Sequence, residues 1–464
     1  MSRHPFGAVN LISDPIHGYI ELTKRLSAVE SADAGLPTEE AAEEDLLDSA
    51  WLQRMRRISQ LQSARWVFPT AEHSRFTHGL GVMHEAGLWA RHLYPSLHDR
   101  LGDDAPSEGL VVETLRIAGL LHDVGHGPFA HFFDDHVLHG HPAPADPRRP
   151  GDKPLSHEDL SQLIIERELG TTIGALRRAP GAVPARDAFA AGEAIDPRWV
   201  AFLVSKPALA DPAMPTWVRL LQPLLSGVFT VDNLDYVRRD AYFTGVSTGP
   251  VDVERLRRYT FIGERGLTLY EPGLGALEVF LSTRLFLYQQ VYFHRTVRAI
   301  DLDLGEVFGP SIRAIFGDAS PAGALSAYAD LDEYALLHQA ALWSRGEAIS
   351  EQPQPGDGHV RAEIATAWQA ILLRRPRWRA EAEVRLSYET QPPEDELAAL
   401  GSDEPGRVFI DRAIVDARPA DATATDSLLA IEGRDGRPAD PLSRTLQRLP
   451  AWSLIARRYR RITD

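Results

Sequence analysis

Leu115 to Asp134, LRIAGLLHDVGHGPFAHFFD, is the stretch that decides the fold. Its first half is apolar with helical spacing, so that Leu115, Ala118 and Leu121 lie close together on one helical face. Its second half adds five ionisable side chains: His122, Asp123, His126, His131 and Asp134. Ionisable groups are costly to bury unless they are paired or bind a metal. The stretch therefore predicts a buried helix that leads into a polar site.

The length and composition favour a large core. The chain has 464 residues, of which 44% are hydrophobic, and this length exceeds an ordinary domain. We predict a mainly α protein with small β-hairpins. Residues 1–310 would form the helical core, with insertions near 26–46, 139–155 and 170–215. Residues 311–464 would form a mixed helical and β lobe that serves oligomerisation or regulation.

Charge and cysteine content exclude several classes of protein. The chain carries 49 basic and 65 acidic residues, for a net charge of −16, which argues against a broad nucleic-acid-coating surface. It has no cysteine, and hence no disulfide, thiolate ligand or thiol nucleophile. The N-terminus lacks the apolar core of a signal peptide, and no apolar run is long enough to span a membrane. We expect a cytoplasmic protein.

Periodicity and helix breakers predict the remaining elements. Asp48 is a candidate N-cap for a helix that begins there. In chain order, we expect a hairpin over 9–22, helices over 48–61 and 73–93, the central helix ending at Gly127-Pro128, a helix capped by Ser156, a helix over 217–225, a hairpin over 259–270, a long helix over 278–308, strands over 382–389, 407–415 and 426–432, and a basic helix near 451–462.

Four residues could form a metal site: His78, the pair His122 and Asp123, and Asp232. Two neutral imidazoles and two carboxylates balance a divalent cation and suit Fe, Mn, Co, Ni or Zn. Any one of these residues alone has an ordinary explanation, because a single helical His is usually a satisfied polar residue and Asp232 could cap a helix. The combination favours a metal site.

Three motifs carry a resemblance to a known family. RFTHGLGV (75–82), GLLHDVGHGPFAHFFD (119–134) and VDNLDYVRRD (231–240) resemble the motifs of the HD-domain phosphohydrolase superfamily. Within it, the chain resembles the deoxynucleoside triphosphate triphosphohydrolases, including the vertebrate SAM-and-HD-domain enzyme and bacterial dGTPase-like relatives, but without a SAM domain. The resemblance runs with gaps from Asp14 to Arg295. It implies a helical core around a metal held by His78, His122, Asp123 and Asp232.

A second group of side chains is expected to move protons. Asp134 is close enough to His131 in sequence to orient and charge it, and such a pair can act as a general acid. In the family the corresponding histidine lies by the α-phosphate. His157, in SHED, resembles another active-site histidine of the family. His126 is either catalytic or a structural support of the metal site.

A triphosphate requires concentrated positive charge in a cleft of this acidic protein. The resemblance implies that Arg75, Tyr236 and Arg284 face the phosphates, although each arginine alone could be an ordinary surface residue. Asn233 stands where the family carries a lysine, so one phosphate-binding charge is lost. Tyr288 replaces a family histidine.

The sugar-binding residues follow from the resemblance alone. Gln60 and Asp240 would hydrogen-bond the 3′-hydroxyl, and Leu61 would border the nucleoside. Tyr292 would pack where a ribose 2′-hydroxyl would lie. The alternative for Leu61 and Tyr292 is that both are ordinary core residues.

A regulatory site is expected on residues 48–61. On a continuous helix, Gln53, Arg56 and Gln60 would share one side. Asp48, Gln53 and Arg56 match family positions that hold a guanine nucleotide between subunits. The resemblance therefore implies activation by GTP or dGTP in a homo-oligomer, either a dimer or a tetramer. The alternative is a capped amphipathic helix whose arginines are solvated.

Three functions remain open from the sequence. The leading hypothesis is metal-dependent hydrolysis of deoxynucleoside triphosphates to deoxynucleoside and inorganic triphosphate, with Mg²⁺ accompanying the nucleotide. The loss of a lysine at Asn233 keeps open an HD-type nucleotide phosphomonoesterase or phosphodiesterase. A non-catalytic module that senses nucleotides or binds nucleic acid is the third alternative, and the complete set of metal and proton-transfer residues argues against it.

Overall fold

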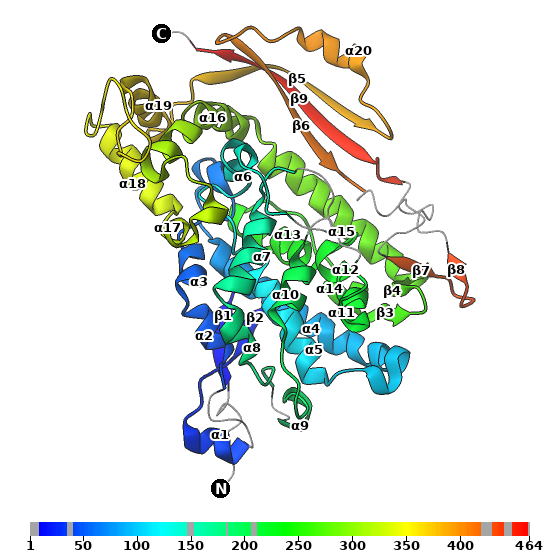
Figure 1. Ribbon diagram of the computed structural model, residues 1–464. Coiled ribbons are helices and arrows are strands. Elements are labelled where there is room, and N and C mark those ends of the chain that lie inside the picture. The colour runs from blue at the N-terminus through cyan, green and yellow to red at the C-terminus, as the bar shows by residue number, and fades with distance from the viewer. Residues whose placement is uncertain are drawn as a thin grey trace.

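The central helix of the fold is α5, Glu108–Leu121, which packs along α4, Arg75–Leu101 (Figure 1). The computed structural model describes residues 9–34, 40–145, 153–181, 184–205, 211–418, 429–439 and 448–462. Every residue of α5 from Gly109 onward is buried. A Cβ atom on Gly119 would lie 2.9 Å from the carbonyl oxygen of Val82, so glycine is what permits this close approach.

Helix α5 ends earlier than predicted. It stops at Leu121 with His122 as its C-cap, and the prediction that it continues to Gly127-Pro128 is wrong. The chain turns here because α7, His157–Arg167, provides polar partners. The Ser161 hydroxyl donates to the carbonyl oxygen of His122 at 3.0 Å and accepts from the amide of Gly125 at 2.9 Å. His122 and Asp123 therefore lie in the turn that follows α5 and not within the helix.

The N-terminal elements confirm the hairpin and correct the helix after it. Strands β1, Val9–Asp14, and β2, Gly18–Thr23, are antiparallel. They are followed by α1 (Ala28–Ala34), α2 (Glu43–Leu47), α3 (Ala50–Met55) and a 3₁₀ turn over Gln62–Trp66.

The predicted N-cap at Asp48 is wrong, because Ser49 caps α3 and accepts from the amide of Leu52. The predicted helix over 48–61 is also too long. Its second half pairs with residues 73–75 instead: the amide of Gln60 donates to His73 O at 3.0 Å, and that of Arg75 to Ile58 O at 3.0 Å. Gln60 therefore does not share a helical side with Gln53 and Arg56.

The middle of the chain supplies the helices that surround α5. Ser156 caps α7 as predicted, in a capping box with Asp159. Thr230, not Asp232, caps α13, and its hydroxyl accepts from the amide of Asn233. The elements are α6 (His131–His136), α8 (Gly170–Gly174), α9 (Pro184–Asp187), α10 (Pro197–Val204), α11 (Thr216–Leu221), α12 (Pro223–Ser226), α13 (Val231–Thr244) and α14 (Val253–Arg258).

The long helix predicted over 278–308 is interrupted. Helix α15, Leu274–Leu287, runs into a π-helical turn over Tyr288–Tyr292, and α16, Arg295–Phe316, starts anew with His294 as its N-cap. A π-helical turn changes the direction in which its side chains point, and such turns are frequent at functional sites. Four more helices follow: α17 (Leu325–Ala329), α18 (Glu333–Trp343), α19 (Ala362–Leu372) and α20 (Glu394–Leu397).

Two further sheets complete the fold. Strands β3, Thr260–Gly263, and β4, Gly266–Tyr270, form the predicted hairpin, and β7, Ala430–Glu432, adds in parallel to β4 with β8, Pro438–Ala439, outside it. The predicted strand over 426–432 is thus confirmed from residue 430, and residues 426–428 lie outside the described ranges.

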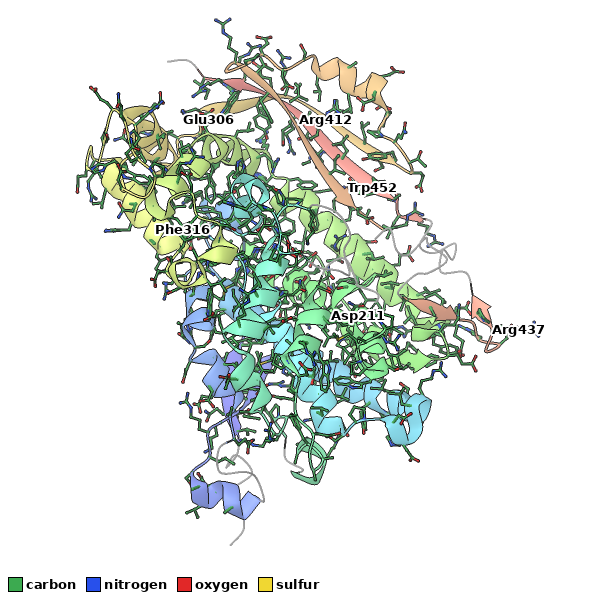
Figure 2. The ribbon with its side chains drawn as sticks, viewed as in Figure 1. Asp211, Glu306, Phe316, Arg412, Arg437 and Trp452 are labelled. Atoms are coloured by element: carbon green, nitrogen blue, oxygen red, sulfur yellow. The ribbon has the colours of Figure 1, made fainter. Side chains whose placement is uncertain are left out.

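The last sheet has the antiparallel order β5-β9-β6. Its strands are β5 (Trp378–Tyr388), β6 (Val408–Asp416) and β9 (Trp452–Arg461), the first two as predicted. The basic helix predicted near 451–462 is wrong, because this segment is the central strand β9, which starts at Trp452 (Figure 2). Its arginines pair across strands, with Arg457 on Glu383 at 2.5 Å and Arg460 on Glu381 at 2.6 Å.

The predicted mainly α fold with small β elements is confirmed. One large apolar core extends from β2 to α19, and the β5-β9-β6 sheet covers α15 and α16 (Figure 1). Among the described ranges, no helix has the length and apolar character needed to cross a membrane.

Candidate active site and metal centre

The structure brings together the four residues predicted to bind a metal. His78 comes from α4, His122 and Asp123 follow α5, and Asp232 lies in the first turn of α13. His78 Nε2 is 3.2 Å from Asp232 Oδ1 and 3.9 Å from Asp123 Oδ2. His122 Nε2 is 3.4 Å from Asp123 Oδ1 and 3.7 Å from Asp232 Oδ1. Two nitrogens and two carboxylates therefore converge on one point.

The hydrogen bonds of the two imidazoles favour metal binding. His78 Nδ1 lies 2.8 Å from Asp235 Oδ2, and His122 Nδ1 lies 2.8 Å from the carbonyl oxygen of Gly119. Both partners are acceptors, so each Nδ1 carries the proton and each Nε2 keeps its lone pair. Both Nε2 atoms are buried without a hydrogen-bond partner in the described part of the chain. This donor set fits a divalent transition metal.

The electrostatics of the site are those of a cation site. Burial alone would lower the pKa of His78, but Asp232 and Asp235 outweigh it and raise that pKa to about 9. Burial would raise the pKa of Asp123, but His122 and Arg75 hold it well below its usual range. The surroundings thus favour positive charge between ionised carboxylates, and a metal ion can supply that charge in place of a proton.

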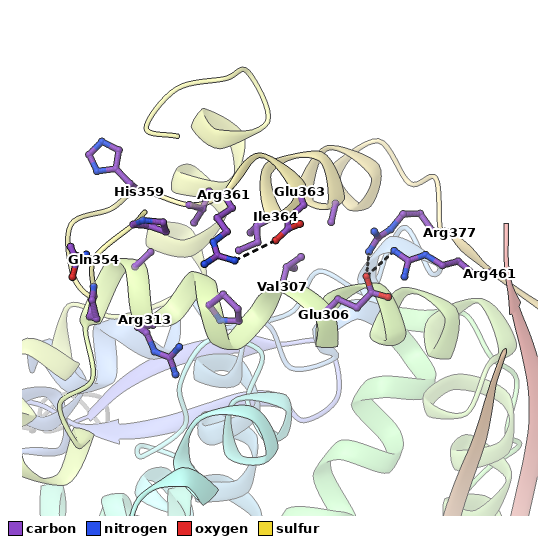
Figure 3. Close-up of a pocket in the computed structure, with 16 residues that line it drawn as sticks. Glu306, Val307, Arg313, Gln354, His359, Arg361, Glu363, Ile364, Arg377 and Arg461 are labelled. Atoms are coloured by element: carbon purple, nitrogen blue, oxygen red, sulfur yellow. Dashed lines mark hydrogen bonds and ion pairs between the residues drawn. The ribbon is translucent and has the colours of Figure 1, made fainter. Parts of the chain in front are cut away.

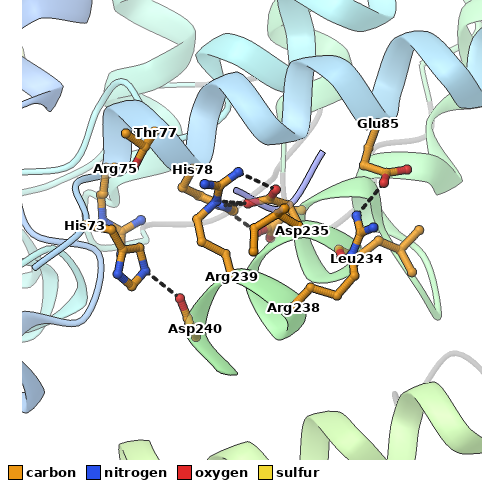
Figure 4. Close-up of polar contacts among 12 residues, drawn as sticks. His73, Arg75, Thr77, His78, Glu85, Leu234, Asp235, Arg238, Arg239 and Asp240 are labelled. Carbon is orange, nitrogen blue, oxygen red and sulfur yellow. Dashed lines mark hydrogen bonds and ion pairs between the residues drawn. The ribbon is translucent and has the colours of Figure 1, made fainter. Parts of the chain in front are cut away.

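Asp235 is a functional residue that sequence reasoning missed. It is fully buried and also interacts with His17 Nε2 at 2.7 Å. Arg239, whose Nε lies 2.8 Å from the Asp235 carboxylate, is seen beside it in Figure 4. A Cβ on Gly81 would lie 2.0 Å from Asp235 Oδ1, so the second glycine of RFTHGLGV makes room for this carboxylate. The spacing of three residues from Asp232 to Asp235 was the available signal.

His131 and His157 share one carboxylate. Asp134 Oδ2 lies 2.5 Å from His157 Nδ1 and 3.6 Å from His131 Nδ1, so the closer partner of Asp134 is His157. Burial would lower the pKa of His157, but Asp134 and Glu158 raise it to about 9. The side chain of His131 is 64% exposed and faces the pocket. The site therefore offers a charged imidazolium at His157 beside the solvent-accessible ring of His131.

His126 lies beneath this pair. It is completely buried, its ring stacks on His157 with centroids 3.6 Å apart, and its Nε2 is 3.4 Å from Asp123 Oδ1. Burial, together with Arg75 and His157, holds the pKa of His126 well below its usual range. His126 does not line the pocket, so its position suits the support of Asp123 and His157 rather than direct contact with a substrate.

One pocket of about 460 Å³ joins the metal site to the predicted substrate residues. Asp123, Asp232, His131 and His157 lie in its wall. Every residue predicted to bind substrate also lines it: Gln60, Leu61, Arg75, Asn233, Tyr236, Asp240, Arg284, Tyr288 and Tyr292.

Arg284 is a cation of the pocket wall that three contacts hold in place. Its Nε donates to Tyr236 Oη at 3.1 Å, its Nη1 donates to the carbonyl oxygen of Asp416 at 2.7 Å, and its guanidinium lies over the ring of Tyr288 at 4.9 Å. Arg75 differs from expectation, because its guanidinium forms an ion pair with Asp123. Its Nε atom is nevertheless buried without a hydrogen-bond partner in the described ranges.

Two of the expected sugar residues, Asp240 and Tyr292, are hydrogen-bonded to each other. Asp240 is buried; one carboxylate oxygen lies 2.8 Å from His73 Nε2, and the other accepts from Tyr292 Oη at 2.5 Å. The Oε1 atom of Gln60 is buried without a partner among the described residues. His73, whose contact with Asp240 appears in Figure 4, had no assigned role in the sequence.

Other pocket residues came without a sequence signal. Asp301 accepts from the Ser63 hydroxyl, and Arg298 is held by Asp411 of β6, with Nη2 2.6 Å from Oδ1 and Nε 3.0 Å from Oδ2. Ser63, Arg298 and Asp301 line the pocket together with Glu158. These residues come from segments far apart in the chain.

The three residues of the predicted regulatory site are only partly together. Arg56 Nε donates to Gln53 Oε1 at 3.0 Å, and its guanidinium lies 3.7 Å above the ring of Phe76. Asp48 is exposed and instead pairs with Arg25 at 3.2 Å.

A larger cavity lies away from the predicted site. It measures about 510 Å³ and lies between α16 and residues 353–367 (Figure 3). Arg377 and Arg461 in its wall both bind Glu306, at 2.7 and 3.1 Å. It contains no residue of the metal or proton-transfer groups.

Substitution of Asp235 tests the support of the metal site. Asp235→Asn keeps the size but removes the charge behind His78, and we expect metal affinity to fall about 10- to 100-fold, the usual effect of losing such a partner. Equilibrium dialysis with metal analysis measures it. Glu85→Gln is the matched control, because Glu85 contacts Arg238 and His17 but not His78. Equal metal affinity in Asp235→Asn and wild type would contradict this role.

Comparisons with known proteins agree with this geometry. Residues 75–173 match the HD domain family. The uncharacterized protein YwfO of Bacillus subtilis is 28% identical over 350 residues, which is 73% of this chain and 67% of that protein. The human deoxynucleoside triphosphate triphosphohydrolase SAMHD1 is 27% identical over 314 residues, which is 65% of this chain and 44% of SAMHD1. The zebrafish (Danio rerio) SAMHD1 is 26% identical over 360 residues, 74% of this chain and 53% of that protein.

The match therefore spans about half the length of the SAMHD1 relatives. Two solved structures share the fold over 98% of this chain: a hypothetical protein from Aquifex aeolicus, with a TM-score of 0.66, 23% identity and 96% of that chain covered, and a phosphohydrolase from Bacteroides thetaiotaomicron, with a TM-score of 0.63, 20% identity and all of that chain covered. The predicted resemblance is confirmed: residues 75–173 match the HD domain family, and the chain resembles the SAMHD1 deoxynucleoside triphosphate triphosphohydrolases.

Proposed function

We propose that the protein is a metal-dependent nucleotide phosphohydrolase that cleaves deoxynucleoside triphosphates into deoxynucleoside and inorganic triphosphate. One observation carries the proposal. Asp123 and Asp232 line a pocket of about 460 Å³ together with His131, His157 and Arg284. His78 Nε2 and His122 Nε2 lie 3.2 and 3.7 Å from Asp232 Oδ1 and so complete the convergent group at this pocket. Metal ligands, proton donors and a phosphate-binding cation are therefore within reach of one substrate. The HD domain and the similarity to SAMHD1 support the same chemistry.

The four convergent residues would hold the divalent ion. At such a site a divalent ion polarises a phosphoryl oxygen and lowers the pKa of water. The donor set does not select among Fe, Mn, Co, Ni and Zn. Mg²⁺ would accompany the triphosphate.

The remaining side chains have separable tasks. His157 is held as an imidazolium by Asp134 and Glu158, and together with Arg284 it would neutralise phosphate charge. Attack of water at the α-phosphorus breaks the bond to the 5′-oxygen, and His131 would deliver the proton that this leaving oxygen takes up. Asp240 and Gln60 would bind the 3′-hydroxyl, and Tyr292 would be fixed against the sugar by its bond to Asp240.

A specific observation supports a second candidate, an HD-type nucleotide phosphomonoesterase or phosphodiesterase. Asn233 has no charge, and Arg75 is ion-paired with Asp123. The positive charge available to a triphosphate is correspondingly smaller, and a substrate with fewer phosphates would require less.

Product analysis tests the proposal against this alternative. The purified protein is incubated with each of the four deoxynucleoside triphosphates and a panel of divalent metals, and the products are separated by chromatography. We expect inorganic triphosphate and deoxynucleoside, and both should disappear in Asp123→Ala along with bound metal. Pyrophosphate or orthophosphate as the first product would favour the alternative. A thermal melt controls for unfolding, because metal binding and stability are linked.

His131→Ala should separate chemistry from binding. We expect kcat to fall about 10²- to 10⁴-fold, the usual contribution of general acid–base catalysis, while metal content stays at the wild-type value. Steady-state kinetics and metal analysis measure both. A change confined to KM would show that His131 binds substrate without transferring a proton.

Tyr292→Ala tests whether the Tyr292 ring excludes the 2′-hydroxyl of a ribonucleotide. Removal of the ring makes room beside the sugar, so the ratio of kcat/KM for a ribonucleotide to that for the matching deoxynucleotide should rise at least about 10-fold. Tyr288→Ala is a control on the same π-helical turn. An unchanged ratio in Tyr292→Ala would place sugar discrimination elsewhere.

Regulation is part of the proposal. We propose that a guanine nucleotide binds at α3 through Gln53 and Arg56, with Asp48, between the subunits of a homo-oligomer, and that residues 311–464 contribute to assembly. GTP or dGTP should then raise the hydrolysis rate of a non-guanine substrate and increase the mass seen by light scattering. Arg56→Ala should remove that rise and keep the basal rate. If guanine nucleotides change neither the hydrolysis rate nor the mass measured by light scattering, the regulatory site is refuted.

A further inference from the structure

The segment that leads to His131 adopts an unfavourable backbone. Phe129 and Ala130 have φ values of 60° and 48°, in the left-handed region that residues other than glycine rarely occupy. Both residues are completely buried, and Ala130 directly precedes the first residue of α6. The direction in which the His131 side chain points therefore depends on an unfavourable backbone conformation, which surrounding contacts must stabilise.

Those contacts come from residues 328–333, some 200 residues later in the chain. The amide of Phe129 donates to Glu333 Oε1 at 3.1 Å, and the Tyr328 hydroxyl donates to the carbonyl oxygen of Gly125 at 2.8 Å. Glu333 and Tyr328 are both completely buried. Together they hold the segment at its start and near its end.

Arg54 of α3 ties the same two regions together. Its Nη1 donates to the carbonyl oxygen of His126 at 2.7 Å, and its Nε donates to that of Leu331 at 3.0 Å. Its guanidinium also lies 4.5 Å from the ring centre of Tyr328. The segment over 125–130 is thus fixed against residues 328–333 by a buried cation as well as by direct hydrogen bonds.

Burying the carboxylate of Glu333 at this position costs free energy. Burial raises its pKa to about 7, although Arg65 and the amides of Phe129 and Ser59 act in the opposite direction. An apolar side chain would avoid this cost, but it could not accept the two amide hydrogens. Because the carboxylate accepts from the amides of Ser59 and Phe129, its contacts point to a role in fixing the backbone at these two residues.

We propose that Glu333 is a positioning residue that holds Phe129 and Ala130 in their left-handed conformation and thereby aims His131 into the pocket. The catalytic part of this inference rests on the proposed role of His131. The structural part, that Glu333 fixes the segment, does not depend on any substrate.

Glu333→Ala, Glu333→Gln and the control Asp332→Asn test the proposal. Asp332 is the neighbouring buried carboxylate, but it caps α18 and pairs with Arg57 instead of contacting residues 125–130. Asparagine retains the cap. Hydrogen exchange by mass spectrometry on a peptide covering residues 124–132 reports the segment directly. We expect exchange at least about 10-fold faster in Glu333→Ala, near wild type in Glu333→Gln, whose amide oxygen still accepts, and unchanged in Asp332→Asn.

The catalytic part is tested by combining Glu333→Ala with His131→Ala. Glu333→Ala alone should lower kcat about 10- to 100-fold with metal content unchanged, because small misplacements of a catalytic group have effects of this size. In the His131→Ala background it should lower kcat no further.

Wild-type exchange in Glu333→Ala overturns the proposal whatever the substrate is. An equal loss of kcat in both backgrounds overturns the action through His131. A wild-type protein that hydrolyses no nucleotide refutes the proposed function instead, and in that case faster exchange still supports the fixing of the segment by Glu333.

Discussion

The close contact between α4 and α5 is the constraint on which the site depends. Gly79 and Gly119 both lie at this contact, where a Cβ atom would come within 3.2 Å of Leu120 O and 2.9 Å of Val82 O, respectively. His78 is next to the first glycine. His122 uses the carbonyl oxygen of the second to fix its tautomer. The helix packing that builds the core therefore also sets two of the converging nitrogens, and larger residues at the glycines would separate them.

The site is assembled from distant parts of the chain. The HD motif segments supply the convergent histidines and carboxylates, but Arg284 is oriented by a carbonyl oxygen at the end of β6, and Arg298 by a carboxylate in the same strand. Tyr328 of α17 and Glu333, the first residue of α18, support the backbone that leads to His131. The C-terminal elements thus hold two pocket side chains in place, which explains why an acidic protein can keep two arginines in fixed positions there.

The sequence predicted the chemistry of the site better than its surroundings. His78, His122, Asp123 and Asp232 could be selected because a His-Asp pair follows an apolar run and is combined with a histidine upstream and an aspartate downstream. Asp235 was missed, although it lies three residues after Asp232, because its role depends on the room that Gly81 leaves. The basic segment that became β9 was misjudged because its arginines pair with glutamates on another strand, and a long-range pairing of this kind leaves no local pattern. The π-helical turn at Tyr288–Tyr292 was missed for a similar reason, because helical periodicity continues through it.

The ion pair between Arg75 and Asp123 has a consequence for the order of events at the site. The guanidinium neutralises one of the carboxylates of the predicted metal site. An ion that occupies Asp123 would weaken this pair and leave the charge of Arg75 available to the phosphates. Metal and nucleotide would then bind with positive coupling, each strengthening the other. The same pair would disfavour nucleotide binding before metal, so a preferred sequence of loading would be built into a single side chain.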